Sequence, residues 1–192
     1  RTESTRIQFL MTLTLTLAEG NYLLGSDTSA EMEIVNYDPP ADRHVWIASG
    51  PGYASDPANW STGTAPGAND DVYLEHFSSA DMVWDGGSNG LPATVKSWTQ
   101  TDSYTGTVTF LTQYPTLDGA TFTNLIVTGD VVINGGAWTH PQSLTRTSGS
   151  AYTVDQLRQL QAYRLCVSIG GGLSLGAAGR MDASGKGYYH SG

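Results

Sequence analysis

Acidic and amide side chains gather in the middle of the chain, and their oxygen atoms are the ligands that a hard cation prefers. Asn69, Asp70 and Asp71 follow a Pro-Gly pair directly. Three more residues of the same kind stand nearby in the sequence, namely Asp56, Asn59 and Asp81. Asp and Asn after Pro-Gly also form ordinary turns, because their side chains bond their own backbone. The sequence therefore leaves two interpretations open for residues 69–71, a calcium site and a turn.

Carboxylates later in the chain have the types needed for polysaccharide chemistry. Glycoside hydrolysis uses two carboxyl groups, and proton abstraction next to a uronate uses an acid with basic partners. The candidates are Asp118, Asp130, Asp182, Arg180 and Lys186. Asp130 follows a glycine and Asp182 lies in the run RMDASGKG, which favours roles in turns. We assign no catalytic residue and predict that the chain is not an enzyme.

The histidines and the cysteine have spacings that favour structural roles. The histidines are His44, His76, His140 and His190. They form none of the HExxH, HxH or HxxxH spacings that bring two imidazoles to one metal. Cys166 is the single cysteine, so an intrachain disulfide and a cysteine zinc cluster are excluded. Calcium remains the one cofactor that the sequence suggests.

Composition and charge exclude two classes of partner. Charged residues make up 14% of the chain, against about 25% in an ordinary soluble domain. The net charge is −9, and residues 1–90 carry 13 acids and 3 bases, which is not the balance of a nucleic-acid-binding protein. No run approaches the roughly 18 apolar residues needed to cross a bilayer. We expect no nucleic-acid partner and no membrane span, and the glycine-rich, lysine-poor composition indicates a β-rich extracellular protein.

Two alternating segments at the start of the chain predict an antiparallel strand pair. Residues 6–17 alternate between apolar residues and Thr or Gln, and residues 30–37 alternate again before Asp38-Pro39-Pro40. A period of two is typical of a half-buried strand. Because a two-stranded hairpin is marginal alone, we expect this pair to join further strands.

The same segment resembles the last two strands of a Calx-beta domain, an immunoglobulin-like sandwich found in tandem arrays on large surface proteins. The matching residues are the run TLTLTLAEGNYLLGS and the strand AEMEIVNYD, about a fifth of the chain. In that family, acids at the end of the final strand bind calcium. Asp38 stands at this position and Asp42 lies nearby. The resemblance thus implies an Ig-like fold for residues 1–38, and it adds Asp38 and Asp42 to the candidate calcium ligands.

A different pattern begins after a proline-containing linker at residues 39–45. A strand with Trp is followed by an Asp-Pro-x-Asn-Trp turn, a Pro-Gly turn, an acidic pair and another strand. This order resembles the opening of repetitive β-helical surface proteins and implies nothing about activity. The matching residues are Trp46, Asp56, Pro57, Asn59, Trp60, Pro66, Gly67, Asp70, Asp71 and Val72.

From about residue 82 the chain consists of short strand-like runs separated by glycine. Glycine supplies the positive φ with which a β-helix turns its corners. Aligning LIVTGDVVINGG at 125 with LCVSIGGGLSLGAAG at 165 gives a unit repeated after about forty residues. A sandwich or jelly roll also fits the strand spacing. We predict an all-β chain with an Ig-like (Calx-beta-like) strand pair and a right-handed parallel β-helix or solenoid over 46–192.

An insertion at 146–164 holds the one segment that predicts a helix, because Thr153 and Gln156 have capping-box spacing. The helix would place Leu157 and Leu160 against the solenoid. Four tryptophans in strand or turn patterns are either sugar-stacking platforms or fillers of the ends and corners of a solenoid, and we favour the second role. They are Trp60, Trp84, Trp98 and Trp138.

These features together predict a structural or adhesive module of an extracellular or cell-surface protein. The chain starts at Arg1 without methionine and stops within a glycine-rich stretch, which indicates a piece of a longer exported protein. The strand at 6–17 would pair with the open end of a β-helix in another copy. Such a heterologous contact continues into a filament. The alternative is a polysaccharide-binding or polysaccharide-degrading β-helix segment whose partners are surface glycans.

Overall fold

The computed structural model describes residues 8–16, 29–142, 151, 153, 154, 156 and 162–186. The chain divides into two compact units, Arg1–Pro39 and Pro40–Gly192. The described residues form short strands, with a 3-10 turn at Pro57–Asn59 (η1). The predicted all-β class is therefore confirmed.

The first unit contains an antiparallel strand pair. β1 (Gln8–Thr16) pairs with β2 (Ser29–Tyr37) in a two-stranded sheet. The register sets Met11 opposite Ile34 and Leu13 opposite Met32, so the apolar alternation of the two strands is in phase. In the part of this unit that the structure describes, no third strand joins the sheet, and the Ig-like sandwich stays a prediction.

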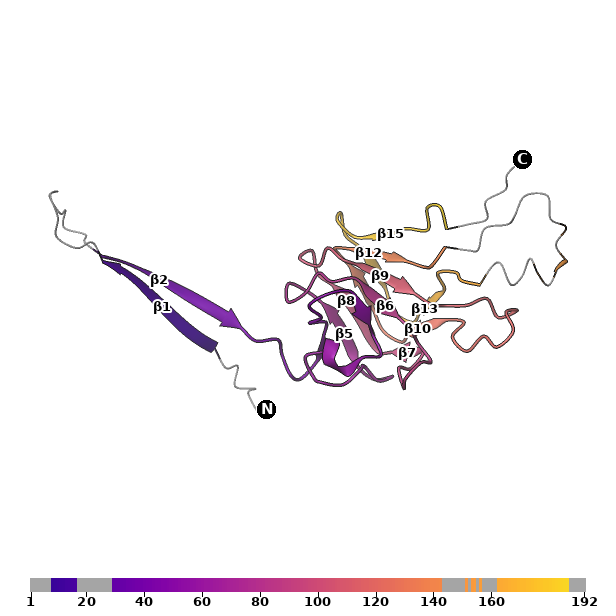
Figure 1. Cartoon of the computed structure of the whole chain (residues 1–192), viewed down its shortest axis with the longest axis horizontal. Coiled ribbons are helices and arrows are strands. Elements are labelled where there is room, and N and C mark those ends of the chain that lie inside the picture. Colours follow the sequence, from indigo (N-terminus) through magenta and orange to yellow (C-terminus); the bar gives the residue numbers. More distant parts are fainter. Residues whose placement is uncertain are drawn as a thin grey trace. The chain divides into compact units, whose positions relative to one another are not determined.

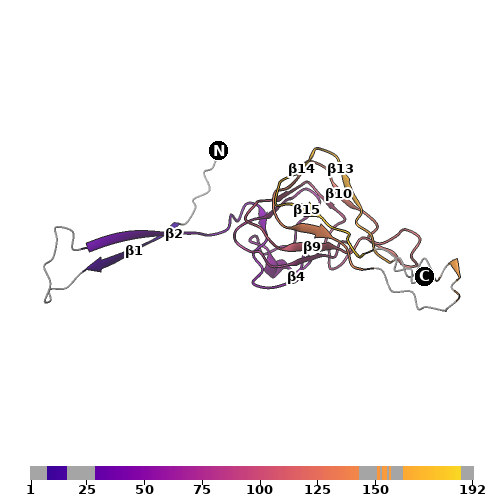
Figure 2. The same ribbon diagram turned by 90° about the horizontal axis from the view of Figure 1, so that it is seen from above.

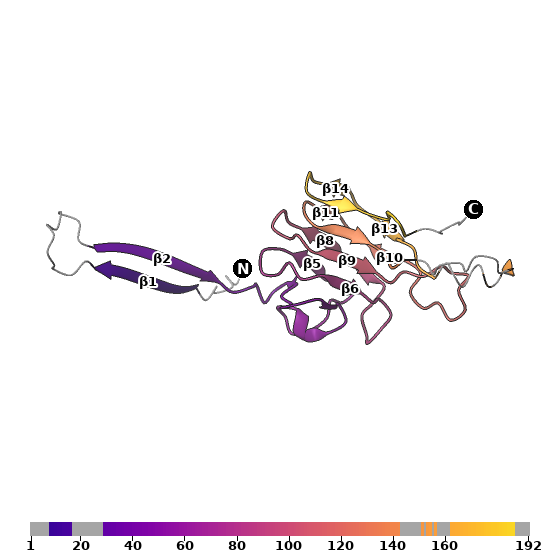
Figure 3. The same cartoon turned by 45° about the horizontal axis from the view of Figure 1, so that its top comes forward.

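The second unit is a β-solenoid of about three turns whose strands stack in parallel (Figure 1). Seen from above in Figure 2, three sheets surround one interior, and Figure 3 shows the strands of successive turns side by side. This parallel stacking excludes the sandwich and jelly-roll alternatives for these residues.

Three complete turns each place one strand in every sheet, and two partial turns precede them. One contains β3 (His44–Val45), β5 (Asp71–Leu74), β8 (Ser97–Gln100), β11 (Val131–Ile133) and β14 (Leu173–Leu175). A second contains β4 (Gly52–Tyr53), β6 (Met82–Trp84), β9 (Thr107–Phe110), β12 (Ala137–Thr139) and β15 (Arg180–Met181). The third contains β7 (Thr94–Val95), β10 (Leu125–Val127) and β13 (Val167–Ile169). The first two turns therefore lack the third sheet.

The repeat has a longer period in the structure than in the sequence alignment. Leu125 pairs with Val167 and Val131 pairs with Leu173, in both cases 42 residues away. The alignment that starts at 165 is therefore displaced by two residues. The displacement arises because turns differ in length, and the loops between strands absorb the difference while the strands keep their register.

Glycine permits close approach of the backbone at one corner. Gly136 has φ of +69°, and a Cβ there would lie 2.5 Å from the carbonyl oxygen of Gly106 on the preceding turn. A side chain would therefore push two turns apart. This contact accounts for the expected glycine signal at a corner between strands.

A column of aromatic rings fills the interior of the solenoid. Neighbouring ring centroids lie 5.3 Å (Trp46–Trp60), 6.5 Å (Trp60–Trp84), 5.0 Å (Trp84–Trp98) and 5.4 Å (Trp98–Trp138) apart. All four contacts have the edge-to-face geometry that aromatic quadrupoles favour. Every tryptophan is at most 1% exposed, so none offers a platform for sugar. Our expectation that four of them lie at ends or corners is too narrow, because the column runs through successive turns.

One polar side chain lies inside this column. Gln100 is fully buried, and its Oε1 accepts hydrogen bonds from the Nε1 groups of Trp98, at 3.0 Å, and Trp138. Its Nε2 donates to the carbonyl oxygen of Gly135 at 2.9 Å. Gln100 therefore satisfies two indole N–H groups and one carbonyl that the core would otherwise leave without partners.

The capping box of the predicted helix is present. The Thr153 N–H donates to Gln156 Oε1 at 2.9 Å, and the Gln156 N–H donates to Thr153 Oγ1 at 3.2 Å. Leu157, Leu160 and most of the predicted helix lie outside the described residues. Among the residues that are described, no helix is long and apolar enough to cross a membrane.

We expect Gln100→Met to lower the free energy of unfolding by about 3 kcal/mol, because it strands two buried indole N–H groups while keeping side-chain length. Urea unfolding followed by tryptophan fluorescence measures this loss. The matched control is Gln142→Met at an exposed glutamine, which should change stability by no more than about 0.5 kcal/mol. Equal stability of the two variants would contradict the role of Gln100.

Candidate functional site

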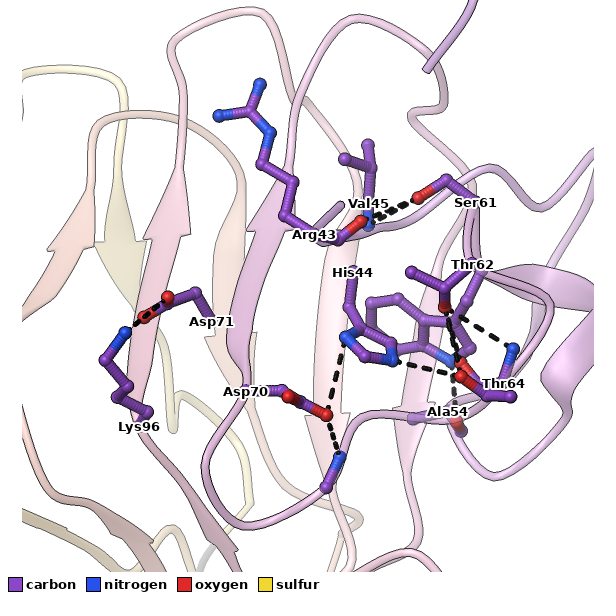
Figure 4. Close-up of polar contacts among 12 residues, drawn as sticks. Arg43, His44, Val45, Ala54, Ser61, Thr62, Thr64, Asp70, Asp71 and Lys96 are labelled. Carbon is purple, nitrogen blue, oxygen red and sulfur yellow. Dashed lines mark hydrogen bonds and ion pairs between the residues drawn. The ribbon is translucent and has the colours of Figure 1, made fainter. Parts of the chain in front are cut away.

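The acidic loop before β5 directs its two carboxylates to different partners (Figure 4). Asp70 Oδ2 accepts a hydrogen bond from the Gly67 N–H at 2.7 Å, which closes the Pro-Gly turn. Asp71 begins β5 and accepts hydrogen bonds from Lys96 Nζ at 2.7 Å and Ser97 Oγ at 2.5 Å on β8. The turn interpretation thus describes Asp70, while Asp71 ties β5 to the next turn.

The other candidate calcium ligands are exposed or accept hydrogen bonds from the backbone. Asp38, Asp42 and Asn69 are exposed. Asp56 accepts from the Ala58 N–H as the cap of η1, and Asp81 accepts from the Thr107 N–H. No group of three or more His, Cys, Asp or Glu within the described ranges is arranged to hold a metal. The calcium site stays a prediction.

A contact among His44, Asp70 and Thr64 was not predicted from the sequence (Figure 4). His44 is 8% exposed; its Nδ1 lies 3.6 Å from Asp70 Oδ2, and its Nε2 lies 3.3 Å from Thr64 Oγ1. The order carboxylate, imidazole, hydroxyl is that of an activated nucleophile, but both separations exceed the 2.6–3.2 Å that such activation uses. Thr64 Oγ1 also contacts Thr62 Oγ1 at 3.3 Å. The contact therefore fastens the loop over residues 62–70 to β3.

Two of the acids considered for polysaccharide chemistry accept hydrogen bonds from backbone N–H groups. Asp130 Oδ1 accepts from the Gly172 N–H at 2.7 Å, and Asp182 Oδ1 accepts from the Ser184 N–H at 2.8 Å. The hydrogen bonds from Ser184 hold the pKa of the Asp182 carboxyl below its usual value. An ionised carboxylate does not act as a general acid. Asp118 is exposed in a loop.

The first turn of the solenoid is closed by the chain itself. Trp60 forms an antiparallel bridge with Trp46, and backbone hydrogen bonds join Ile47 to Asn59 and Ser61 to Val45. Trp60 Nε1 donates to the carbonyl oxygen of Ala54 at 2.7 Å, which fixes the indole within the core. Residues 59–61 thus occupy the outer edge at residues 45–47, so that part of the edge is not available to another strand. We call it the closed end.

The last turn that the structure describes has an uncovered outer edge within the described part of the chain. β13, β14 and β15 each pair with a strand of the preceding turn, and no further strand pairs with them among the residues that the structure describes. Leu173, Leu175 and Met181 are 52%, 53% and 40% exposed, although they continue rows of buried residues. Their partners in the preceding turn, Val131, Ile133 and Trp138, are fully buried. The open end therefore presents both strand edges and core-type side chains.

The chain was compared with protein-family models, curated proteins and solved structures. No protein-family model, curated protein or solved structure matches the chain. Function is therefore inferred from the described geometry alone. Pairing at an open β-helix end stays a prediction, and the residues at that end follow only from the register of β14 and β15.

We expect the stabilising effect of Asp71 to depend on pH. Burial raises the pKa of its carboxyl, but the hydrogen bonds from Lys96 and Ser97 outweigh burial, and the pKa lies below 3.8. A folded-state pKa below the unfolded value stabilises the fold above the unfolded pKa, and this stabilisation is lost as the pH falls through the folded pKa. Thermal unfolding should show wild type more stable than Asp71→Asn at pH 7, with the difference shrinking below pH 3.8.

The control for this experiment is Asp102→Asn, since Asp102 is an exposed acid in a turn. This variant should follow the wild-type pH dependence throughout. A constant difference between wild type and Asp71→Asn from pH 7 to acid would show that the carboxylate charge contributes nothing.

Proposed function

We propose that the chain is a structural or adhesive module that self-associates through the open end of its solenoid. The supporting observation is the exposure of Leu173, Leu175 and Met181 in register with buried rows. Unpaired strand edges recruit strands from other chains, with backbone hydrogen bonds supplying affinity and side-chain rows supplying register. Covering these three half-exposed side chains contributes about 1 kcal/mol each.

The donor in this proposal is the N-terminal strand pair of another copy. In the described part of that unit, β1 and β2 form a sheet of two strands, each with an outer edge available for pairing. The closed end cannot serve as donor, because residues 59–61 already occupy its edge. A contact between two different surfaces that does not close repeats into a filament.

The same proposal includes the Ig-like fold of the first unit, the handedness of the solenoid and the location of the protein. Residues 1–38 would be the last strands of an Ig-like, Calx-beta-like sandwich whose remaining strands come from outside the pair. The solenoid would be right-handed, as parallel crossover connections nearly always are. Low charge and abundant glycine support a location outside the cell or on its surface, where the module would take part in adhesion.

We expect Leu175→Lys to abolish self-association, because it places a charge in the apolar row of the open end. Thr12→Pro should do the same from the donor side, since proline removes an N–H from β1. Negative-stain electron microscopy and sedimentation velocity would show filaments for wild type and discrete particles for both variants.

The matched control is Ile126→Lys. Ile126 is 41% exposed on the outer face of β10, between two paired strands and away from the open end. It should assemble as wild type does. Discrete monomers of wild type, or filaments of Leu175→Lys, would contradict the proposal.

Calcium is the cofactor in this proposal. A bound ion would draw Asp71 away from Lys96 and toward Asp70, with Asn69 as a third oxygen donor. Ligand that binds only the folded chain raises stability by about 2.7 kcal/mol at a hundredfold excess over its dissociation constant. We expect added calcium to raise the unfolding temperature of wild type but not of Asp70→Asn. An unchanged wild-type melting curve in calcium would contradict a site in this loop.

A further inference from the structure

A pocket opens where β4 and β6 end. Ser55 stands two residues after the end of β4, and Asp85 directly follows β6. Ser88 and Asn89, from the loop at residues 86–91, form an adjacent wall. The lining also includes Tyr53, Asp56, Asn89 and Leu111. The lining thus has one aromatic ring, that of Tyr53. Its polar side chains come from two serines, one asparagine and two acids. We call it the Tyr53 pocket.

A buried carboxylate forms part of the lining. Asp85 is 6% exposed, and its two oxygens accept hydrogen bonds from the Ser55 N–H at 3.1 Å and the Ser55 hydroxyl at 2.6 Å. Asp85 has no ion pair with any residue in the described part of the chain. Because each carboxylate oxygen accepts two hydrogen bonds, half of its acceptor capacity is unused. The remaining acceptor positions of this carboxyl group can take hydrogen bonds from the hydroxyls of a ligand.

An exposed aromatic ring and an asparagine side chain complete the lining. Tyr53 is 57% exposed on β4, in contrast to the buried rings of the column. Asn89 has φ of +47°, and its Nδ2 lies 3.5 Å from Ser55 Oγ. Asn tolerates this conformation in turns, and Asn89 stands before Gly90 in the loop at residues 86–91. The pocket thus combines an apolar ring face with convergent hydrogen-bonding groups.

We infer that the Tyr53 pocket binds a neutral sugar ring. The apolar face of a pyranose matches the exposed Tyr53 ring, and two neighbouring hydroxyls supply the donors that Asp85 lacks. Asn89 offers an amide to a third hydroxyl. Two acids and no basic residue line the pocket, so a uronate would be repelled. This binding does not depend on self-association, because the pocket residues precede the last turn of the solenoid.

The test uses the purified chain and four tetrasaccharides: cellotetraose, maltotetraose, mannotetraose and tetragalacturonate. Isothermal titration should show binding of at least one neutral tetrasaccharide and weaker binding of the uronate. Tyr53→Ala should weaken that binding about tenfold while leaving the melting curve unchanged, because the side chain is exposed. Asp85→Asn should weaken it by a similar factor, since it replaces an ionic acceptor.

The matched control is Tyr73→Ala. Tyr73 lies on β5 under the Arg43 guanidinium and outside the pocket, so its loss should leave sugar affinity unchanged. Three results would overturn the inference: no neutral tetrasaccharide binds, the uronate binds as tightly as the neutral sugars, or Tyr53→Ala binds as wild type does. If Asp85→Asn does not fold, Tyr53→Ala decides the outcome alone.

Discussion

The solenoid depends on keeping a column of large rings in step with the stacking of its strands. Strands of a sheet lie about 4.8 Å apart, and the ring centroids of the column follow one another at 5.0–6.5 Å. Edge-to-face rings at this separation fill the interior without a second layer of structure. The indole N–H groups that come with this filling need acceptors, and Gln100 provides two of them from within the column. Gln100 Oε1 thus serves Trp98 and Trp138, whereas the buried Nε1 of Trp84 has no hydrogen-bond partner among the described residues.

The two ends of the column are treated differently. At the closed end, Trp60 folds back beneath Trp46 and residues 59–61 complete the backbone pairing. At the open end, the row that contains Val131 continues into Leu173, which lacks a covering turn among the described residues. Within the described residues the two ends of the solenoid therefore differ, and the proposed assembly uses this difference.

The sequence predicted the structure best where the backbone conformation requires a particular residue type. The alternation at β1 and β2, the glycine corners and the Thr153–Gln156 cap were all readable, because each is a local requirement. Strands of two to four residues carry too little periodicity to fix the register. The period of the repeat and the strand partners therefore could not be predicted from the sequence. Adjacency also misled: Asp70 and Asp71 are neighbours in sequence, but one closes a turn and the other begins a strand, so their carboxylates have separate partners. The His44 contact and the Tyr53 pocket join residues from different turns, which no local pattern reveals.

The closed end also bears on how the solenoid acquires its fold. In a stack where each turn contacts only its neighbours, stability propagates from turn to turn. The closed end lies at the start of the solenoid and ties residues 45–47 to residues 59–61, a separation of about fifteen residues with a small loop-closure cost. It can therefore form first during synthesis and serve as a template on which later turns are laid down in order. Folding of this unit would proceed in one direction along the chain. A substitution of Trp60 would then lower the stability of every turn that follows.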